Sequence, residues 1–405
     1  MRSLAVLSLH TSPLAQPGSG DSGGMNVYVR ELVAALAQAG VTSEVYVRRW
    51  ADDLPEVVDV EPGFRVVHVD AGPSDLAKED LPEVVDEFTD GVARHLRRQG
   101  GPDAIHANYW LSGLAGHRLK HELSLPLVST FHTLARVKAE TGDPEPDRRV
   151  DAETEVIACS DAILANCPDE VAQLVELYGA DPSRIEIVPP GVDHAFFSPG
   201  DRRGARAALG LGDHPVLLFV GRIQPLKGLT VAIGALAELS AAHPDAVLVA
   251  VGGQSGAGGA EEMAAAQALI DIHGLHDRVR FVPPQPHHLL STYYRAADVC
   301  IVPSRSESFG LVALEAAACG TPVVAAAVGG LRTLVDDGVT GFLVDTRDPA
   351  EYAAAVATLL DDEGLSAKIA EAAADRARGF TWSTTAARLR RLYADLTSRT
   401  PVSCS

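Results

Sequence analysis

The 405-residue sequence is poor in basic side chains. Its 34 lysines and arginines are outnumbered by 54 aspartates and glutamates, and the formal net charge is −20. Nucleic acids require a basic protein face, and anionic membrane surfaces attract polybasic segments, so this composition argues against both partners. An anionic ligand would therefore have to be bound by a few local cations and backbone N–H groups.

The sequence also lacks long apolar runs and paired cysteines. No run approaches the roughly 20 residues that span a bilayer, so we expect no transmembrane segment. Met1-Arg2-Ser3 leads directly into the apolar run 4–9 without a cleavage-site pattern, which predicts no signal peptide. An odd number of scattered cysteines, with no CxxC pair and no metal-ligand spacing, is typical of reduced thiols in a cytoplasm. These are Cys159, Cys167, Cys300, Cys319 and Cys404. We expect a cytoplasmic protein with no metal site.

The order of apolar segments predicts two α/β domains, since 405 residues are too many for one ordinary core. Short apolar strands alternate with amphipathic helices, which is typical of doubly wound parallel sheets. The pattern breaks near Pro189-Pro190-Gly191, which indicates a linker. The expected strands are 4–9, 45–47, 66–69, 104–106, 127–131, 162–165 and 185–188, then 216–220, 247–251, 279–282, 299–302, 323–325 and 342–344.

The last expected helix runs from about Ser383 to Ser398, with Ser383 as its N-cap. Leu389, Leu392 and Leu396 form its apolar stripe. No strand follows, so we expect this helix to pack on a neighbouring face. The expected domains are 1–192 and 193–380, followed by a C-terminal helical segment 381–405 that packs back across the first domain.

The stretch ESFGLVALE places two carboxylates, Glu307 and Glu315, eight residues apart. Glu307 stands in a turn after the expected strand 299–302, and Glu315 lies in a short helix. Such a strand–turn–helix junction directs backbone N–H groups at one spot, which favours a phosphate, while carboxylates beside it suit sugar hydroxyls. Glu315 has apolar neighbours, so burial would leave it in need of a partner such as a ribose diol. The alternatives are a helix-capping Glu307 and a solvated Glu315.

Cations and glycines stand at other expected strand ends. Arg222 and Lys227 in GRIQPLKG could converge on a diphosphate and offset its charge as it leaves, or could be surface cations. The glycine-rich loop 18–26 precedes the first helix and could approach an anion, although its spacing is not GxGxxG and it could be a solvated loop. His132 in TFHT could orient a sugar hydroxyl or could be structural.

Together these motifs resemble glycosyltransferase family 4. Glu307 to Glu315 is similar to the E-x7-E motif of that family, and Gly221 to Gly228 is similar to its GRxxPxKG diphosphate-binding turn. The resemblance covers essentially the whole chain. It implies a GT-B architecture, with two facing Rossmann-like domains and an interdomain cleft. Domain 1–192 would bind the acceptor, and domain 193–380 would bind the nucleotide sugar. The resemblance also implies retaining sugar transfer from a nucleotide sugar, with neither a DxD metal site nor a cofactor.

The same resemblance implies roles for single residues. Arg222 and Lys227 would bind the diphosphate, Glu315 the ribose, and Gly24 the diphosphate through its backbone. Glu307 and His132 would lie near the transferred sugar. The implied catalytic set is His132, Arg222, Lys227 and Glu307. The implied donor set is Gly23, Gly24, Arg222, Lys227, Gln285, Glu307, Phe309, Gly310, Leu311 and Glu315. The implied acceptor set is His10, Asn26, Lys78, Tyr109, Thr133 and Arg149.

A narrower resemblance rests on HTSP at 10–13, GDSGGMNVY at 20–28 and YWLSG at 109–113. These segments are similar to the mycothiol-pathway D-inositol-3-phosphate glycosyltransferases, which transfer N-acetylglucosamine from UDP-GlcNAc to 1D-myo-inositol 3-phosphate. That likeness implies an acceptor-phosphate clamp of Lys78, Tyr109, Thr133 and Arg149. Gln285 stands where those enzymes carry an arginine near the base, and 138–147 also differ, which leaves base and acceptor open.

Several functions stay open at this point. One is a glycosyltransferase of a natural-product or sucrose-phosphate-type pathway. Another is a sugar-nucleotide epimerase on the same scaffold, and a third is a non-catalytic nucleotide-sugar-binding protein. The expected partners are a nucleotide sugar, with UDP as its expected nucleotide, and a small acceptor; a homodimer is left open. The sequence offers no obvious nucleophile, so we expect a leaving-group phosphate oxygen to take the acceptor proton.

Overall fold

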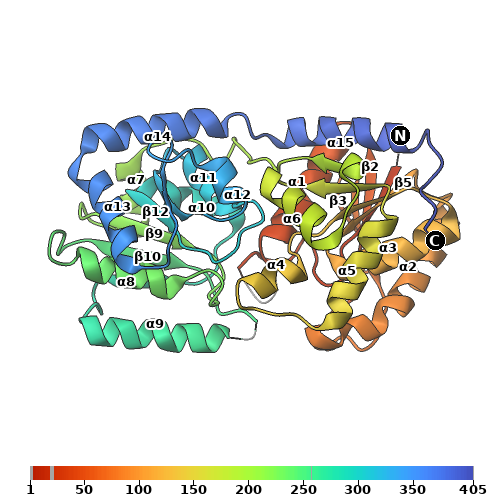
Figure 1. Ribbon diagram of the computed structural model, residues 1–405, viewed down its shortest axis with the longest axis horizontal. Helices are drawn as coiled ribbons and strands as arrows, with labels where there is room; N and C mark the ends of the chain where they lie inside the picture. The colour runs from red at the N-terminus through yellow and green to blue at the C-terminus, as the bar shows by residue number, and fades with distance from the viewer. Residues whose placement is uncertain (1–2, 19–21, 257, 405) are drawn as a thin grey trace. The chain divides into compact units, whose positions relative to one another are not determined.

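The computed structural model describes residues 3–18, 22–256 and 258–404 (Figure 1). The chain divides into two compact units. The first comprises Met1–Ala15, Met25–Pro190 and Trp382–Ser405, and the second comprises Gln16–Gly24 and Gly191–Thr381. Each unit is an α/β domain with its own largely parallel sheet, which confirms the predicted Rossmann-like fold class. The expected first domain, 1–192, includes the loop 16–24, whereas the structure groups this loop with the second unit.

The sheet of the first unit has the strand order β3-β4-β2-β1-β5-β6-β7-β8. Its strands are β1 (Ser3–Leu7), β2 (Thr42–Arg48), β3 (Val57–Glu61), β4 (Phe64–Val69), β5 (Ala104–Asn108), β6 (Leu127–Thr130), β7 (Ala162–Ala165) and β8 (Ile185–Ile187). Adjacent described strands run parallel except β3, which pairs antiparallel with β4 at the edge. The sequence analysis missed β3, because Asp59 and Glu61 interrupt its apolar residues and the strand is only half-buried.

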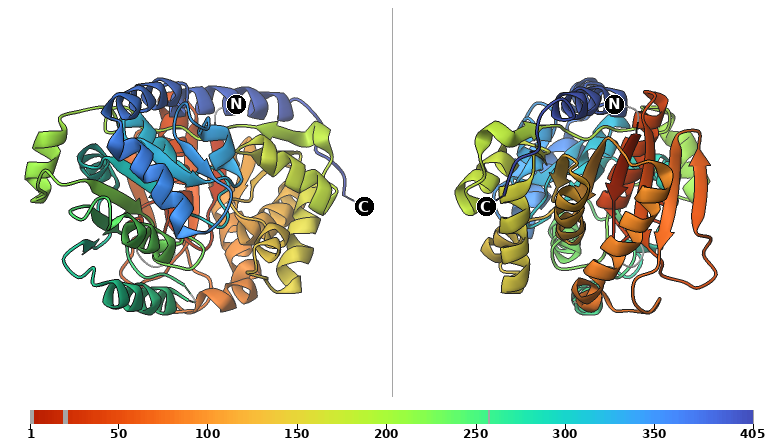
Figure 2. Two further views of the ribbon diagram at one scale, coloured as in Figure 1. Left: turned by 60° about the vertical axis from the view of Figure 1, so that its left-hand side comes forward. Right: turned by 90° about the vertical axis from the view of Figure 1, so that its right-hand side faces the viewer.

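Helices cover both faces of this sheet (Figure 2, right). They are α1 (Gly24–Gln38), α2 (Val85–Gln99), α3 (Trp110–Leu123), α4 (Ala135–Glu140), α5 (Asp147–Cys159), α6 (Pro168–Tyr178) and α15 (Trp382–Leu396), with 3₁₀ turns η1 (Lys78–Val84) and η2 (Pro182–Arg184). Successive residues of β1 point to opposite faces. Leu4 and Val6 pack with α1 and α15, whereas Ala5 and Leu7 pack with α2 and α3.

The C-terminal helix α15 belongs to the core of the first unit. Leu389 and Tyr393 are fully buried there, beside Leu36 of α1 and Val45 of β2. The Tyr393 hydroxyl also bonds Nδ1 of the buried His106 in β5 at 2.8 Å. The helix begins at Trp382, so the expected N-cap at Ser383 is wrong and this serine lies in the first turn.

The second unit has the strand order β11-β10-β9-β12-β13-β14 (Figure 2, left). Its strands are β9 (Val216–Val220), β10 (Val247–Val251), β11 (Val279–Val282), β12 (Val299–Val302), β13 (Val323–Ala326) and β14 (Phe342–Val344). Its helices are α7 (Arg202–Leu209), α8 (Leu229–Leu239), α9 (Gly259–His273), α10 (Leu290–Ala296), α11 (Leu311–Ala318), α12 (Gly330–Leu334), α13 (Pro349–Asp361) and α14 (Glu363–Ala377), with the 3₁₀ turn η3 (His287–Leu289). The strand order reverses between β9 and β12. In open α/β sheets, ligands bind beyond the carboxyl ends of strands at such a switch point.

The structure corrects the expectation that all the cysteines are reduced. Cys159 and Cys404 are joined as a disulfide, with Cα atoms 5.3 Å apart. Cys167, Cys300 and Cys319 are buried thiols. Separately, none of the described helices combines the length and the apolar character that crossing a bilayer requires.

We predict that Leu389→Ala lowers the free energy of unfolding of the first unit by about 2–5 kcal/mol, because the truncation leaves a cavity in a closed core. Urea denaturation followed by circular dichroism measures this change. The control is Arg391→Ala on the exposed face of α15, which should stay within about 0.5 kcal/mol. Equal effects of the two substitutions would mean that α15 is not part of the core.

Candidate functional site

The loops that follow β9 and β12 meet at the switch point of the second unit. Lys227 Nζ lies 2.6 Å from Glu307 Oε2, and the two side chains are 23% and 16% exposed. The two motifs that the sequence analysis singled out therefore make direct contact. A lysine ammonium has three N–H donors, of which Glu307 takes one.

Glycines allow the Glu307 turn to pack closely against the next loop. Gly329 has φ +46°, and a Cβ atom there would lie 2.1 Å from the backbone oxygen of Glu307. Gly330 N donates to that same oxygen at 3.0 Å. Gly310, with φ +101°, is the N-cap of α11, so Leu311 opens this helix and Phe309 packs beneath it in the core. The helix α11 thus begins four residues after Glu307, and its N-terminus has backbone N–H groups that suit an anion.

Arg222 lies beside the glycine-rich loop. A Cβ on Gly23 would be 3.2 Å from Arg222 Nε, and one on Gly24 would be 3.6 Å from a methyl group of Leu311. Arg222 Nη1 also contacts Ser255 Oγ at 3.4 Å. Ser19, Gly20 and Asp21 of this loop lie outside the described residues. Gly23 therefore lies beside Arg222, and Gly24 lies beside Leu311. All four residues belong to the expected donor set.

Glu315 differs from the expectation. Its side chain is buried, but His287 Nε2 lies 2.6 Å from Oε1 and the Tyr294 hydroxyl donates to Oε2 at 2.8 Å. The argument that Glu315 lacks a protein partner is therefore wrong. Burial, reinforced by the Glu315 charge, raises the pKa of Tyr294 well above its ordinary value. Tyr294 is therefore a neutral donor, and any ribose would share Glu315 with His287 and Tyr294.

Gln285 turns towards its own loop. Its side-chain Nε2 donates to Pro283 O at 2.8 Å. Its backbone oxygen accepts a hydrogen bond from the side chain of Gln16, which precedes the glycine-rich loop. The backbone of Gln285 therefore contacts the segment just before the glycine-rich loop, whereas its side chain stays with its own loop.

In the first unit, three of the four residues of the expected acceptor-phosphate clamp come together, since Arg149 of α5 contacts Tyr109 and Thr133 beyond the ends of β5 and β6. Arg149 Nη2 donates to both the backbone oxygen and Oγ1 of Thr133, each at 3.0 Å. The Arg149 guanidinium carbon lies 4.9 Å from the centre of the Tyr109 ring. This cation–π contact orients a planar, fully charged group beside two hydroxyls.

Arg149 is also the centre of a buried charge network. Its Nε and Nη1 contact Glu153 at 2.8 Å and Glu145 at 2.9 Å. Burial lowers the pKa of the guanidinium, but Tyr109, Glu153 and Glu145 more than offset this, so the pKa is raised. Glu153 is fully buried and also accepts from Ala135 N at 2.9 Å and from the Tyr178 hydroxyl. Arg149 therefore neutralises a carboxylate that has no access to water.

His132 sits at the end of β6 in the left-handed region, with φ +62°. Its Nε2 lies 2.9 Å from Asn108 Oδ1, and its ring meets Tyr28 edge-on at 4.9 Å. Desolvation, with a smaller contribution from His106, lowers the pKa of His132 to about 3. The imidazole is therefore neutral near pH 7. If Nε2–H donates to Asn108, Nδ1 is an acceptor.

The remaining acceptor candidates are placed as follows. His10 stacks on Tyr109 with ring centres 4.4 Å apart. Asn26 is buried, and its amide donates to Thr11 Oγ1 and Ser12 O, each at 2.6 Å. Lys78 is exposed at the start of η1. The next residue, Glu79, accepts from the Arg148 side chain at 2.7 Å, which brings this turn close to α5.

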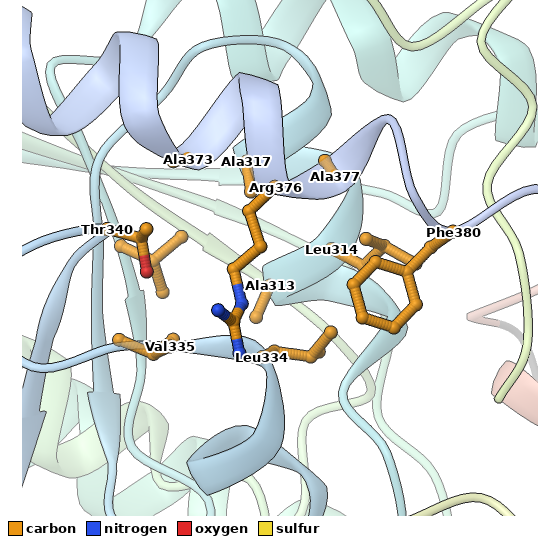
Figure 3. Close-up of a pocket in the computed structure, with 11 residues that line it drawn as sticks. Ala313, Leu314, Ala317, Leu334, Val335, Thr340, Ala373, Arg376, Ala377 and Phe380 are labelled. Carbon is orange, nitrogen blue, oxygen red and sulfur yellow. The ribbon is translucent and has the colours of Figure 1, made fainter.

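Two hollows in the second unit do not belong to this site. One is a small, mainly apolar hollow between α11 and α14, with the Arg376 side chain in it (Figure 3). The other, of about 310 Å³, lies at Arg202, Arg295 and Arg378. Neither is lined by any of the candidate residues. Polar groups at strand ends, rather than these hollows, therefore identify the site.

Comparison with known proteins agrees with this geometry. Residues 22–196 match the family described as Glycosyltransferase Family 4, and residues 201–376 match Glycosyl transferases group 1. The chain is 49% identical to D-inositol 3-phosphate glycosyltransferase 2 of Catenulispora acidiphila, covering 97% of this chain and 95% of that protein. It is 50% identical to D-inositol 3-phosphate glycosyltransferase of Geodermatophilus obscurus, covering 95% and 87%. The chain belongs to glycosyltransferase family 4.

A solved structure extends this family relationship. The sucrose-phosphate synthase of Thermosynechococcus elongatus is 33% identical to this glycosyltransferase and superposes with a TM-score of 0.92, covering 98% of this chain and 100% of that one. Because neighbours of known GT-B architecture share the fold and the family is established, the enzyme is a nucleotide-sugar-dependent hexosyltransferase. This confirms the predicted enzyme class.

Several residues at the glycosyltransferase site were not predicted. His287 and Tyr294 hold Glu315, Ser255 contacts Arg222, and Asn108 orients His132. Asn108 follows a predicted strand, so its position at the end of β5 was a usable signal. His287 and Tyr294 come from η3 and α10, where no spacing in the sequence links them to Glu315.

We predict that Arg149→Met destabilises the first unit by about 3–5 kcal/mol, because Glu153 then stays buried without its cation. Adding Glu153→Gln removes the unpaired charge and should restore most of the loss. Urea denaturation of the single and double variants gives the coupling free energy. If the double variant is no more stable than Arg149→Met, the network does not act through the buried charge.

Proposed function

We propose that this chain transfers N-acetylglucosamine from UDP-GlcNAc to a hydroxyl of 1D-myo-inositol 3-phosphate, with retention at the anomeric carbon. The relatives named D-inositol 3-phosphate glycosyltransferase carry this proposal, because they are about half identical over nearly the whole chain. The Tyr109–Thr133–Arg149 cluster adds support, since two hydroxyls and a guanidinium form a suitable set for a phosphate monoester.

The donor is assigned to the second unit. Lys227 and Arg222 supply cations for the diphosphate, and the N-terminus of α11 supplies backbone N–H groups. As the nucleotide diphosphate leaves, its negative charge grows, and preorganised cations stabilise that change. Glu307 holds the Lys227 ammonium in place before the donor arrives and remains available to a sugar hydroxyl. Glu315, held in place by contacts with His287 and Tyr294, is assigned to the ribose.

The acceptor is assigned to the first unit. Its phosphate would bind at Tyr109, Thr133 and Arg149, with Lys78 as an additional cation. Arg149 already contacts Thr133 through Nη2, so a phosphate oxygen would join or replace this contact. The other guanidinium nitrogens stay with Glu145 and Glu153, which fixes the direction of the fork.

The proposed chemistry proceeds on one face of the sugar. A phosphate oxygen of the leaving diphosphate takes the proton from the acceptor hydroxyl as the new glycosidic bond forms. Neutral His132 then acts through a hydrogen bond to the sugar and not as a cation. A double displacement would need a carboxylate nucleophile, and the one described carboxylate at the diphosphate turn, Glu307, is paired with Lys227. A trapped covalent glycosyl-enzyme would contradict the same-face mechanism.

One second candidate has specific support. The 33% identity and TM-score of 0.92 to a sucrose-phosphate synthase favour a sucrose-phosphate-type transfer, in which the acceptor is a phosphorylated sugar. Both candidates need an acceptor phosphate, so the cluster around Arg149 does not separate them.

A substrate screen separates these candidates. UDP-, GDP- and ADP-sugars are incubated alone, with 1D-myo-inositol 3-phosphate, with myo-inositol, or with fructose 6-phosphate, and nucleotide release and product stereochemistry are measured. The proposal expects UDP release from UDP-GlcNAc only with inositol phosphate, and an α-linked product. Transfer only to fructose 6-phosphate would favour the second candidate. Conversion of the nucleotide sugar to its epimer, without UDP release, would indicate an epimerase.

We predict that Lys227→Ala lowers kcat by about 10²-fold or more, because the departing diphosphate loses its cation. Steady-state kinetics at saturating donor and acceptor measure the change. Lys368→Ala, an exposed lysine on α14, is the matched control and should keep wild-type kcat. An unchanged kcat in Lys227→Ala would reject this role.

We predict that Lys78→Ala raises the KM for the phosphorylated acceptor about 10-fold or more, since a charge-assisted hydrogen bond contributes about 1.5–3 kcal/mol. Hydrolysis of the donor without acceptor should not change. Lys78 is exposed, so this variant avoids the folding defect expected for Arg149. An unchanged acceptor KM would place the acceptor phosphate elsewhere.

A further inference from the structure

A cluster of two histidines and two cysteines lies in the first unit, apart from the residues assigned above. His117 and His121 are one helical turn apart on α3, with ring centres 4.9 Å apart. Cys159 ends α5, and Cys404 lies in the tail after α15, which runs back beside α3 (Figure 1). One ligand atom from each of the four side chains lies within 4.8 Å of the others.

The two His121–sulfur edges of the cluster are close to those of a tetrahedral metal centre, which the four side chains could form once the disulfide is reduced. His121 Nε2 lies 3.3 Å from the sulfur of Cys159 and 3.3 Å from the sulfur of Cys404. Zn–S bonds of about 2.3 Å and Zn–N bonds of about 2.0 Å at a tetrahedral angle give an N···S edge of about 3.5 Å. A Cα separation of 5.3 Å suits a disulfide. A disulfide does not require an imidazole, whereas a metal centre would use His121 as a ligand beside both sulfurs.

The surroundings contain the outer groups that such a centre needs. His117 Nδ1 lies 3.0 Å from Glu155 Oε1. Ligating histidines commonly donate their second ring N–H to a carboxylate, which leaves Nε2 of His117 for a metal. Lys120 Nζ donates to the backbone oxygen of Cys159 at 2.6 Å and to Asp161 at 2.8 Å. Lys120 thereby fixes the segment that carries Cys159.

The tail that carries Cys404 is held by the same segment. Val402 N donates to Asp161 Oδ1 at 2.6 Å. Asp161 therefore links Lys120 on α3, the end of α5 and the C-terminal tail. Cys404 reaches the two histidines because of this docking.

We infer that His117, His121, Cys159 and Cys404 bind one Zn²⁺ when the two cysteines are reduced. A thiol reductant supplies two electrons and two protons to the disulfide, and is itself oxidised to a disulfide. Zn²⁺ then displaces the two thiol protons and binds both thiolates and two neutral imidazoles. The complex carries no net charge. Four protein ligands leave no open position, so the site is structural and clamps the C-terminal tail to α3 and α5.

The inference is tested on tag-free protein. The protein is reduced with an excess of thiol, and the thiol is then removed. Zinc is titrated against a competing chelator, and Co²⁺ is used as a spectroscopic probe. The expected results are one Zn²⁺ per chain, thiolate-to-cobalt charge transfer and tetrahedral d–d bands. Cys404→Ser and His121→Asn should abolish these signals, whereas His273→Asn, an exposed histidine ending α9, should retain them. Glu155→Gln should weaken zinc binding about 10–100-fold without changing the stoichiometry.

Protection of the C-terminal tail from hydrogen exchange gives a readout that does not involve catalysis. Zinc should slow hydrogen exchange at Val402 in the reduced wild type and not in Cys404→Ser. Zinc binding that is unchanged in Cys404→Ser and His121→Asn would overturn the inference. A Cys159–Cys404 disulfide that survives the reductant, seen by peptide mass, would overturn it as well, because the thiolate ligands would not form.

Discussion

The pairing of Lys227 with Glu307 depends on one constraint, the adjacency of β9 and β12 in the second sheet. The two residues are 80 positions apart in the chain, and the sheet order alone makes them neighbours. A strongly acidic protein must keep its few useful cations away from its many other carboxylates. The ion pair with Glu307 at the strand end fixes the position of Lys227, but it also partly neutralises the ammonium charge. An arriving diphosphate, with more charge than Glu307, can then compete for the same ammonium.

The fold was largely predictable because buried parallel strands are short runs of β-branched residues. β9 to β14 were found this way, whereas β3 was missed because acidic residues interrupt a half-buried edge strand. The meeting of GRIQPLKG with ESFGLVALE followed from their positions at strand ends. The partners of Glu315 did not, because His287 and Tyr294 reach it from other elements through tertiary packing. No local pattern in a sequence encodes such contacts.

The first unit shows how binding and stability can share one side chain. The family resemblance implied that Arg149 is a phosphate ligand, yet most of its guanidinium contacts the buried Glu153 and the half-buried Glu145. The contacts that satisfy the buried Glu153 also hold this guanidinium rigidly at the proposed acceptor site. The four candidate zinc ligands were also not recognisable as a group from the sequence. His117 and His121 have a visible i, i+4 spacing, but Cys159 and Cys404 are 245 residues apart, so only the folded chain brings the four together.

The division of the first unit between distant parts of the chain bears on its biosynthesis. A ribosome produces Met25–Pro190 early but adds α15 only after all of Gly191–Thr381. Until then the core residues of the first unit that pack on α15 lack that part of their cover. The second unit can therefore complete its core before α15, the last helix of the first unit, has been synthesised. Apolar surface that is exposed during this interval would be available to chaperones until α15 packs against α1 and β2.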